Sequence, residues 1–323
     1  QRADRREWGA LALILALALM LRLFKADASL WYDEIFTLVN FVRLPTLELI
    51  GTFDSLNNHM LYSLLAQNTV GVFGENPLAL RLPAILFGLG SIYIQWRIAR
   101  RVTGPGSALI VALLLTLSYH HVWFSQNARG YTGLLFFTSA ATLLFLKGLE
   151  KRDWKTWAGY GLVVAAAMYT HMSAGFFFVA HGVVYAAMAG YALLKMQPES
   201  PLPGLRSWGP VRAIKEIGQS ISSAGPLVPL ILLGAVLVLT AGIAALWKRA
   251  PVLTAIYVVH VPLAMLLLYI VGVRIWPRYF FVDIGFIFMA LVEGVFVWSR
   301  IIAPRFQFRG QPVFDAGWIS RMG

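Results

Sequence analysis

The chain has 323 residues, of which 59% are hydrophobic and only 13% are charged. Soluble domains usually carry about 25% charged residues, and the mean hydropathy of this chain is +0.69. The composition therefore predicts an all-α polytopic membrane protein and excludes an ordinary soluble enzyme. The chain has no cysteine, which excludes disulfides, thiol catalysis and metal sites with cysteine ligands.

The formal net charge of +12 raises the question of nucleic-acid binding. The basic residues, however, cluster at the ends of apolar runs, which is typical of helix anchors and cytoplasmic loops. We therefore expect no nucleic-acid partner. Arg2, Arg5 and Arg6 precede the first apolar run and predict a cytoplasmic N-terminus. Because no small-residue cleavage site follows that run, we do not expect it to be a removed signal peptide.

Nine apolar runs are interpreted as membrane spans. In chain order they are 8–24, 78–96, 106–123, 131–146, 157–170, 174–194, 226–247, 252–271 and 280–298. A span needs about 20 apolar residues, so 157–170 is short. The first outer loop, residues 25–77, is predicted to contain interfacial helices, one starting at Leu44-Pro45-Thr46 and one over 59–73.

The span count conflicts with the charge pattern. A basic cytoplasmic tail, residues 300–323, places both termini inside, and this requires an even number of spans. The conflict lies between Lys195 and Lys248, because both look cytoplasmic while one span separates them. Ten spans are therefore expected, and we favour a segment missing between Lys195 and Pro226. The alternative is that the charge signal fails there.

Two adjacent carboxylates, Asp33 and Glu34, follow the first span where it leaves the membrane. A carboxylate at the edge of a bilayer is costly unless it pairs or takes part in chemistry. On the outer side such a group could act as a general base. A solvated loop acid or a helix N-cap explains the pair equally well, and the residues alone leave both interpretations open.

His59 follows Asn57 and Asn58 at the start of the interfacial run. It could orient an acceptor hydroxyl, assist proton transfer or share a divalent metal with Asp33 and Glu34. The two asparagines could instead cap the helix, and a lone histidine at a helix start is more often structural.

Two arginines also fall on the outer side by this topology. Arg129 lies in the run Ser-Gln-Asn-Ala-Arg-Gly-Tyr, residues 125–131, and Arg278 lies in Trp-Pro-Arg-Tyr-Phe. An arginine at membrane depth needs an anion such as a carboxylate, a lipid headgroup or a substrate phosphate. The alternatives are snorkelling for Arg129 and an ion pair with Asp283 for Arg278. Glu293, deep in the last span, has no evident partner in the sequence.

Read in order, these motifs resemble the polyprenyl-phosphate-sugar-dependent glycosyltransferases of the GT-C fold, especially the bacterial relatives of protein O-mannosyltransferases and aminoarabinose transferases. The resemblance covers roughly residues 8–299. It rests on Asp33-Glu34, Asn58-His59, Leu61-Tyr62, the run Ala79 to Ala84, the run Ser125 to Tyr131, Tyr169 to His171, and Pro277 to Phe280.

The resemblance implies a GT-C-like transmembrane domain, residues 1–299, in the cytoplasmic membrane with its active site outside. It implies an inverting transfer of a hexose or pentose from a polyprenyl-phosphate carrier to a glycan, lipid or protein acceptor. Asp33 matches the catalytic acid that would deprotonate the acceptor hydroxyl, with Glu34 beside it. The donor phosphate would be held by Arg129, Arg278, Tyr131 and Tyr279. The acceptor and sugar pocket would include His59, Asn58, Tyr62, His171 and Arg81.

Two departures from the family pattern concern the loop shape and the chain length. Relatives often have His-Pro-Pro or Lys-Pro-Pro where this chain has His59-Met60-Leu61, and many relatives are longer. The missing crossing and the short length favour an alternative, which is a catalytically silent GT-C-like subunit of a membrane complex, with a protein partner. A transporter is not favoured, because paired Gly/Pro-broken spans in two related halves are not found. The sequence leaves a divalent metal near Asp33, Glu34 and His59 open.

Overall fold

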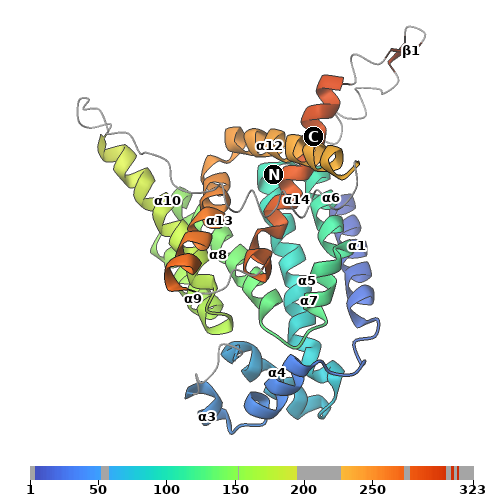
Figure 1. The fold of residues 1–323 in the computed structure, drawn as a ribbon, viewed down its shortest axis with the longest axis vertical. Coiled ribbons are helices and arrows are strands. Elements are labelled where there is room, and N and C mark those ends of the chain that lie inside the picture. The colour runs from blue at the N-terminus through green and yellow to red at the C-terminus, as the bar shows by residue number, and fades with distance from the viewer. Residues whose placement is uncertain are drawn as a thin grey trace.

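The protein is described by a computed structural model over residues 4–51, 58–151, 153–194, 227–272, 277–302, 307–308 and 311–312. Long helices run side by side as a bundle, and short helices gather at one end of it (Figure 1). The only strands in these ranges are β1 (Gln307–Phe308) and β2 (Gln311–Pro312), which pair antiparallel. The predicted all-α membrane architecture is confirmed.

The first half of the chain forms α1 (Arg5–Leu23), α2 (Tyr32–Thr37), the π-helical turn η1 (Leu38–Val42), α3 (Thr46–Gly51), α4 (Met60–Phe73), α5 (Pro77–Val102), α6 (Pro105–Leu117), α7 (Tyr119–Ser125) and α8 (Tyr131–Lys151). The second half forms α9 (Trp154–Thr170), α10 (Ala174–Leu194), α12 (Leu227–Arg249), α13 (Pro251–Val271), the 3-10 turn η2 (Pro277–Asp283) and α14 (Ile284–Ile302).

Each of the nine predicted spans coincides with helix in this structure. By length and composition, however, only five helices in the described ranges are able to cross a membrane, namely α5, α8, α12, α13 and α14. Together α6 and α7 would make a sixth. Three predicted spans fall short, because α1 carries charges at both ends, α9 has 17 residues and α10 is counted only over Ala174–Gly190. The number of nine spans is therefore not confirmed.

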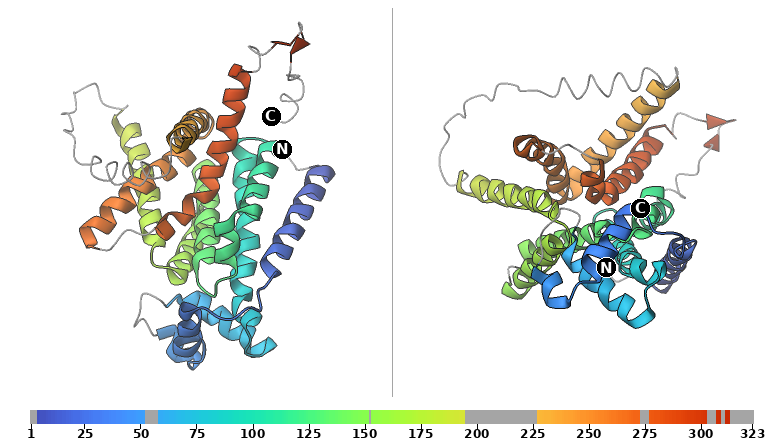
Figure 2. Two further views of the ribbon diagram at one scale, coloured as in Figure 1. Left: turned by 45° about the vertical axis from the view of Figure 1, so that its right-hand side comes forward. Right: turned by 60° about the horizontal axis from the view of Figure 1, so that its bottom comes forward.

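The helices predicted in the first outer loop are present, and α2, α3 and α4 gather at one end of the bundle, here called the loop end (Figure 2). As predicted, a helix begins at Thr46, directly after Pro45. A small apolar core that includes Tyr62 and Leu80 joins α4 to α5. The opposite end, where α1 begins and α14 ends, is called the N-terminal end (Figure 1).

The predicted span over 106–123 is not one straight helix, because α6 and α7 meet at a bend of 61°. The side chain of Ser118 ends α6 and caps α7 by accepting a hydrogen bond from the His121 N–H. The fully buried Arg22 of α1 reaches the same bend, with Nη atoms 3.5 Å from two carbonyl oxygens in the last turn of α6. Those carbonyls have no partner within their helix, so Arg22 stabilises the break.

Two histidines inside the bundle are paired with other buried polar groups. His181, predicted to be a packed helix residue, is 1% exposed and contacts Thr142 and Tyr160. Asp283 lies 3.0 Å from Nδ1 of His260. Asp283 is thus hydrogen-bonded to His260, and the alternative pairing considered for Arg278 is not supported.

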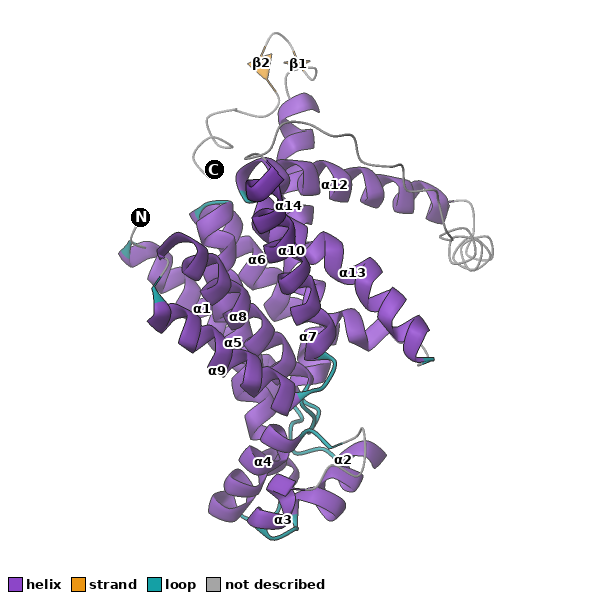
Figure 3. Ribbon diagram, turned by 90° about the vertical axis from the view of Figure 1, so that its left-hand side faces the viewer, coloured by secondary structure: helices purple, strands orange, loops and turns teal. Residues whose placement is uncertain are grey.

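Helix α12 lies crosswise to α1, α5 and α8 at the N-terminal end (Figures 1 and 3). It packs against α14 at two glycines, because a Cβ built on Gly242 would lie 1.8 Å from the carbonyl oxygen of Ala290 and one on Gly294 would lie 1.9 Å from that of Val238. Without α12 the nine predicted spans become eight, an even number. If α12 does not cross the membrane, the conflict between the number of spans and the charge pattern disappears.

We expect both ends of α12 to be accessible from the same side of the membrane. The chain has no cysteine, so Ile231→Cys and Trp247→Cys can each be labelled alone with a membrane-impermeant maleimide in vesicles of known orientation. Both should react from the side that labels Trp8→Cys at the start of α1. Labelling of the two ends from opposite sides would show that α12 crosses the membrane.

Candidate active site at the loop end

Glu34 is the centre of a buried polar network. Its side chain is fully buried, and its two oxygens accept hydrogen bonds from Arg81 of α5, Nε at 2.8 Å and Nη2 at 2.6 Å. The same carboxylate accepts from the N–H of Trp31 at 2.9 Å and of Ala128 at 2.7 Å. Because both oxygens are engaged and inaccessible, a catalytic role does not fit Glu34. Its geometry is that of a positioning residue.

Arg81 is similarly committed to the fold. It is 2% exposed and donates further hydrogen bonds to three carbonyls of the segment between α1 and α2, those of Ala26, Ala28 and Ser29. Tyr62 is fully buried, and its hydroxyl donates to the Leu80 carbonyl at 2.7 Å. Both side chains are buried and engaged in hydrogen bonds within the fold, so direct contact with a substrate does not fit Arg81 or Tyr62.

Asp33 has a different environment from its neighbour. Its side chain is 48% exposed, and Oδ2 lies 2.6 Å from Nη1 of Arg129. Two neighbouring residues of α2 thus contact two neighbouring residues of the segment 125–131. Glu34 accepts a hydrogen bond from the Ala128 N–H, and Asp33 pairs with Arg129. These contacts hold α2 against the segment 125–131. Of the two carboxylates, Asp33 is the one that a substrate can reach.

The segment 125–131 contains two positioning residues that sequence reasoning missed. The Gln126 side-chain amide donates to three carbonyls at the end of α1, those of Leu21, Arg22 and Phe24. Gly130 lies so close to its neighbours that a Cβ there would be 2.7 Å from the Thr170 carbonyl oxygen and 3.1 Å from His59 Cβ. A glycine directly after the arginine was the one available signal for this close approach.

An aromatic cluster lies beside the ion pair. The guanidinium carbon of Arg129 is 5.1 Å from the ring centroid of Tyr131. The rings of His59 and His171 stack at 4.6 Å, and each also contacts the ring of Tyr131, at 5.7 Å and 5.2 Å. The structure therefore brings four of the predicted site residues together, although they come from three separate stretches of the chain.

Both histidines of this cluster are neutral at physiological pH. Burial, together with the neighbouring His171 and the positive charge of Arg129, holds the pKa of His59 well below its usual value. Partial burial and the guanidinium groups of Arg129 and Arg278 lower the pKa of His171 to about 3. His59 is hydrogen-bonded to the Thr170 carbonyl, and its buried Nε2 has no partner within the described part of the chain. A neutral imidazole that donates through one nitrogen offers a lone pair on the other.

The remaining predicted residues lie close to this cluster or under it. The charge of Arg278 acts on both histidines, and its guanidinium carbon is 6.0 Å from the ring centroid of Tyr279. Asn58 is buried, and its Oδ1 accepts a hydrogen bond from Ser63 Oγ at 3.3 Å. Asn57, considered as a helix cap, lies outside the described residues.

A divalent metal at Asp33, Glu34 and His59 does not fit this arrangement. Across the ranges given above, no three or more His, Asp or Glu side chains form a group that could hold a metal ion. The oxygens of Glu34 are already engaged by Arg81 and two backbone N–H groups. No step of the chemistry proposed below therefore depends on a metal ion.

Residues 59–199 match the model of the dolichyl-phosphate-mannose-protein mannosyltransferase family. The match covers less than half of the chain, and it supports the resemblance to the GT-C glycosyltransferases. It includes His59 and Arg129, while Asp33 and Arg278 lie outside the matched residues. No curated protein matches the chain. The resemblance found in the motifs is thus confirmed, and it supports a mannosyltransferase-like membrane glycosyltransferase.

Proposed function

We propose that the chain transfers a sugar from a polyprenyl-phosphate carrier to an acceptor hydroxyl at the loop end. The observation that carries the proposal is the ion pair of Asp33 and Arg129, 2.6 Å apart beside the stacked His59 and His171. It joins an exposed carboxylate, which can take a proton, to a guanidinium group, which can hold a phosphate.

The acceptor oxygen would attack the anomeric carbon of the sugar while the bond from that carbon to the phosphate oxygen breaks, with inversion. The hydroxyl proton goes to the Asp33 carboxylate. The electron pair of the broken bond goes to the departing polyprenyl phosphate, whose negative charge Arg129 and Arg278 stabilise. A phosphate leaving group needs little protonation, so two positioned cations supply the main electrostatic contribution.

The ion pair also couples donor binding to the base. In the structure one guanidinium nitrogen of Arg129 donates a hydrogen bond to the Asp33 carboxylate. A donor phosphate bound to Arg129 would compete for that nitrogen and free Asp33 to accept a proton. The lone pair on Nε2 of the neutral His59 would accept a hydrogen bond from the acceptor hydroxyl or the sugar. The rings of Tyr131 and Tyr279 would pack against the guanidinium groups of Arg129 and Arg278 and keep them in position.

The loop end would lie on the extracytoplasmic face of the cytoplasmic membrane, with the N-terminus in the cytoplasm. On that face the acceptor would be a glycan, a lipid or a protein, and the donor would reach the site from the lipid phase. A catalytically silent subunit would keep the fold and the ion pair while binding a protein partner in place of turnover.

A transfer assay separates these two functions. The purified protein in nanodiscs is given labelled polyprenyl-phosphate-mannose, then other polyprenyl-phosphate sugars, with and without an extract of cell-envelope acceptors. We expect label to move to an acceptor and polyprenyl phosphate to be released, both only when the extract is present. Donor binding without turnover under every condition, together with a stable protein partner in the purified complex, would support the silent subunit.

A further inference from the structure

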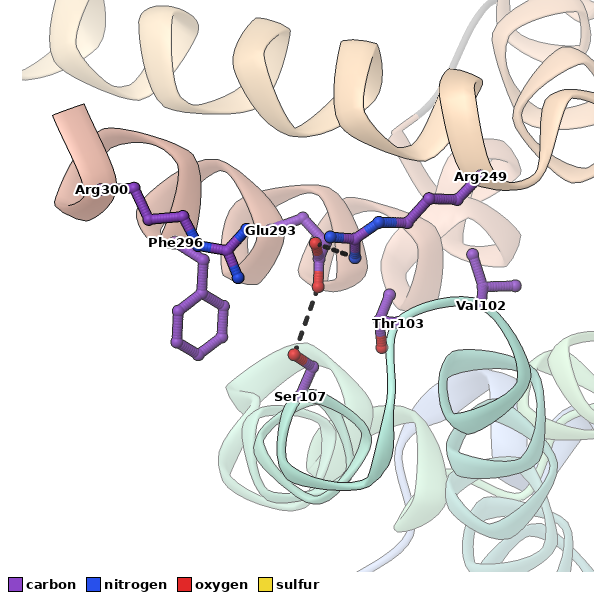
Figure 4. A pocket seen from close by; sticks show the side chains of 7 residues that line it. All are labelled: Val102, Thr103, Ser107, Arg249, Glu293, Phe296 and Arg300. Carbon is purple, nitrogen blue, oxygen red and sulfur yellow. Dashed lines mark hydrogen bonds and ion pairs between the residues drawn. The ribbon is translucent and has the colours of Figure 1, made fainter. Parts of the chain in front are cut away.

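A small polar cavity, drawn in Figure 4, lies at the N-terminal end, opposite the loop end with the candidate active site. Its volume is about 140 Å³, and it lies between the start of α6, the end of α12 and the second half of α14. The lining residues are Val102, Thr103, Ser107, Arg249, Glu293, Phe296 and Arg300. The proposed glycosyl transfer uses none of them.

The one carboxylate in this cavity, that of Glu293, forms an ion pair with one of the two arginines that line it. Glu293 is 3% exposed in the middle of a mostly apolar helix, a position that is costly unless the charge is paired or functional. Its Oε2 lies 2.6 Å from Nη1 of Arg249, and its Oε1 accepts a hydrogen bond from Ser107 Oγ at 3.2 Å. The partner that the sequence did not reveal is thus an arginine at the cavity wall.

The second cation, Arg300, is not neutralised by this carboxylate. It follows Glu293 by seven residues, which places both on one face of α14, and its side chain extends back toward Glu293 (Figure 4). No hydrogen bond or ion pair joins Arg300 to any residue that the structure describes. With Arg249 and Arg300 against one carboxylate, the cavity carries a net charge of one positive unit.

We propose that this cavity binds a phosphate group that carries one negative charge, such as the phosphodiester of an anionic lipid headgroup or a small soluble phosphate. Arginine forks pair well with phosphate oxygens, and the first N–H groups of α6, at the edge of the cavity, have no partner within their helix. A cavity needs only about 10–15 Å³ to hold one water molecule, so about 140 Å³ leaves room for a phosphate group. Basic pockets between helices at the cytoplasmic face are suited to lipid headgroups.

Two substitutions with opposite expected signs test the site. Arg300→Gln removes the unneutralised cation, so the dissociation constant of the anion should rise about tenfold or more. Glu293→Gln frees Arg249 and adds one net positive charge, so the same constant should fall. If the residues were purely structural, both substitutions would lower stability and neither would tighten anion binding. Arg300→Lys keeps the charge and should retain most of the affinity.

Binding is measured as saturable thermal stabilisation of the purified protein by short-chain phosphatidylglycerol or by inorganic phosphate, with neutral detergent as the baseline. Stabilisation by the lipid alone assigns the site to a headgroup, and equal stabilisation by inorganic phosphate assigns it to a soluble anion. Arg97→Gln, a cation on α5 at the same end that does not line the cavity, should behave as wild type. The proposal is overturned if neither ligand stabilises the protein or if Arg300→Gln binds as tightly as wild type.

Discussion

Replacing Asp33 with asparagine should lower the rate of sugar transfer by about 10²–10⁴-fold, the usual contribution of a general base. Asparagine has nearly the same shape as aspartate, but it cannot take the proton of the acceptor hydroxyl. The side chain is 48% exposed and is not part of the core, so the fold should survive. The measurement is the rate of label transfer from the polyprenyl-phosphate sugar, normalised to folded protein.

Donor binding gives the second measurement for this variant. Asparagine carries no charge to hold Arg129, so the guanidinium is freer to bind the donor phosphate and affinity should stay equal or increase. Asp27→Asn is the matched control, because Asp27 is an exposed acid in the same loop, and it should transfer sugar at the wild-type rate. Full transfer by Asp33→Asn would exclude Asp33 as the base, whereas loss of donor binding would indicate a structural role.

The helices of this protein were largely predictable because they depend on local sequence. Long apolar runs with charged ends specify helices whatever they pack against, and the cap residues are local as well, as Asn76 shows at the start of α5. The break at Ser118 was not predictable in this way. It depends on Arg22, which lies on α1 and reaches the end of α6 only in the folded bundle. The crosswise position of α12 is likewise a property of tertiary packing.

Which residues lie at the candidate site could be predicted from the sequence more easily than which role each of them has. The order of motifs along alternating spans correctly placed Asp33, Arg129, His59 and His171 together. Nothing local separates Asp33 from Glu34, since both are acids at adjacent positions on a short helix. Their roles differ only because Arg81, far along the chain, pairs with one of them. Burial of a charge is decided by such distant partners, and one sequence does not show them.

Replacing Glu34 with glutamine should lower the free energy of unfolding by about 3–5 kcal/mol, the usual cost of leaving one partner of a buried ion pair uncompensated. Arg81 would keep its charge at 2% exposure with no anion beside it. The measurement is thermal or denaturant unfolding of the purified protein. Glu75→Gln is the matched control, because its pair with Arg43 is exposed at 45% and 53%, and it should leave stability nearly unchanged.

Substitution of Asp33 should mainly lower the rate of sugar transfer, whereas substitution of Glu34 should mainly lower the stability of the fold. Asp33→Asn should lose transfer while losing less stability than Glu34→Gln, because its carboxylate is 48% exposed and serves a substrate. Glu34→Gln should lose stability first, because its charge serves Arg81 and the Ala128 N–H, and these contacts hold Arg129 in register with Asp33. Transfer by the folded fraction of Glu34→Gln should show a raised KM for the donor with a smaller change in kcat. A Glu34→Gln protein as stable as wild type but without transfer would instead make Glu34 the catalytic carboxylate.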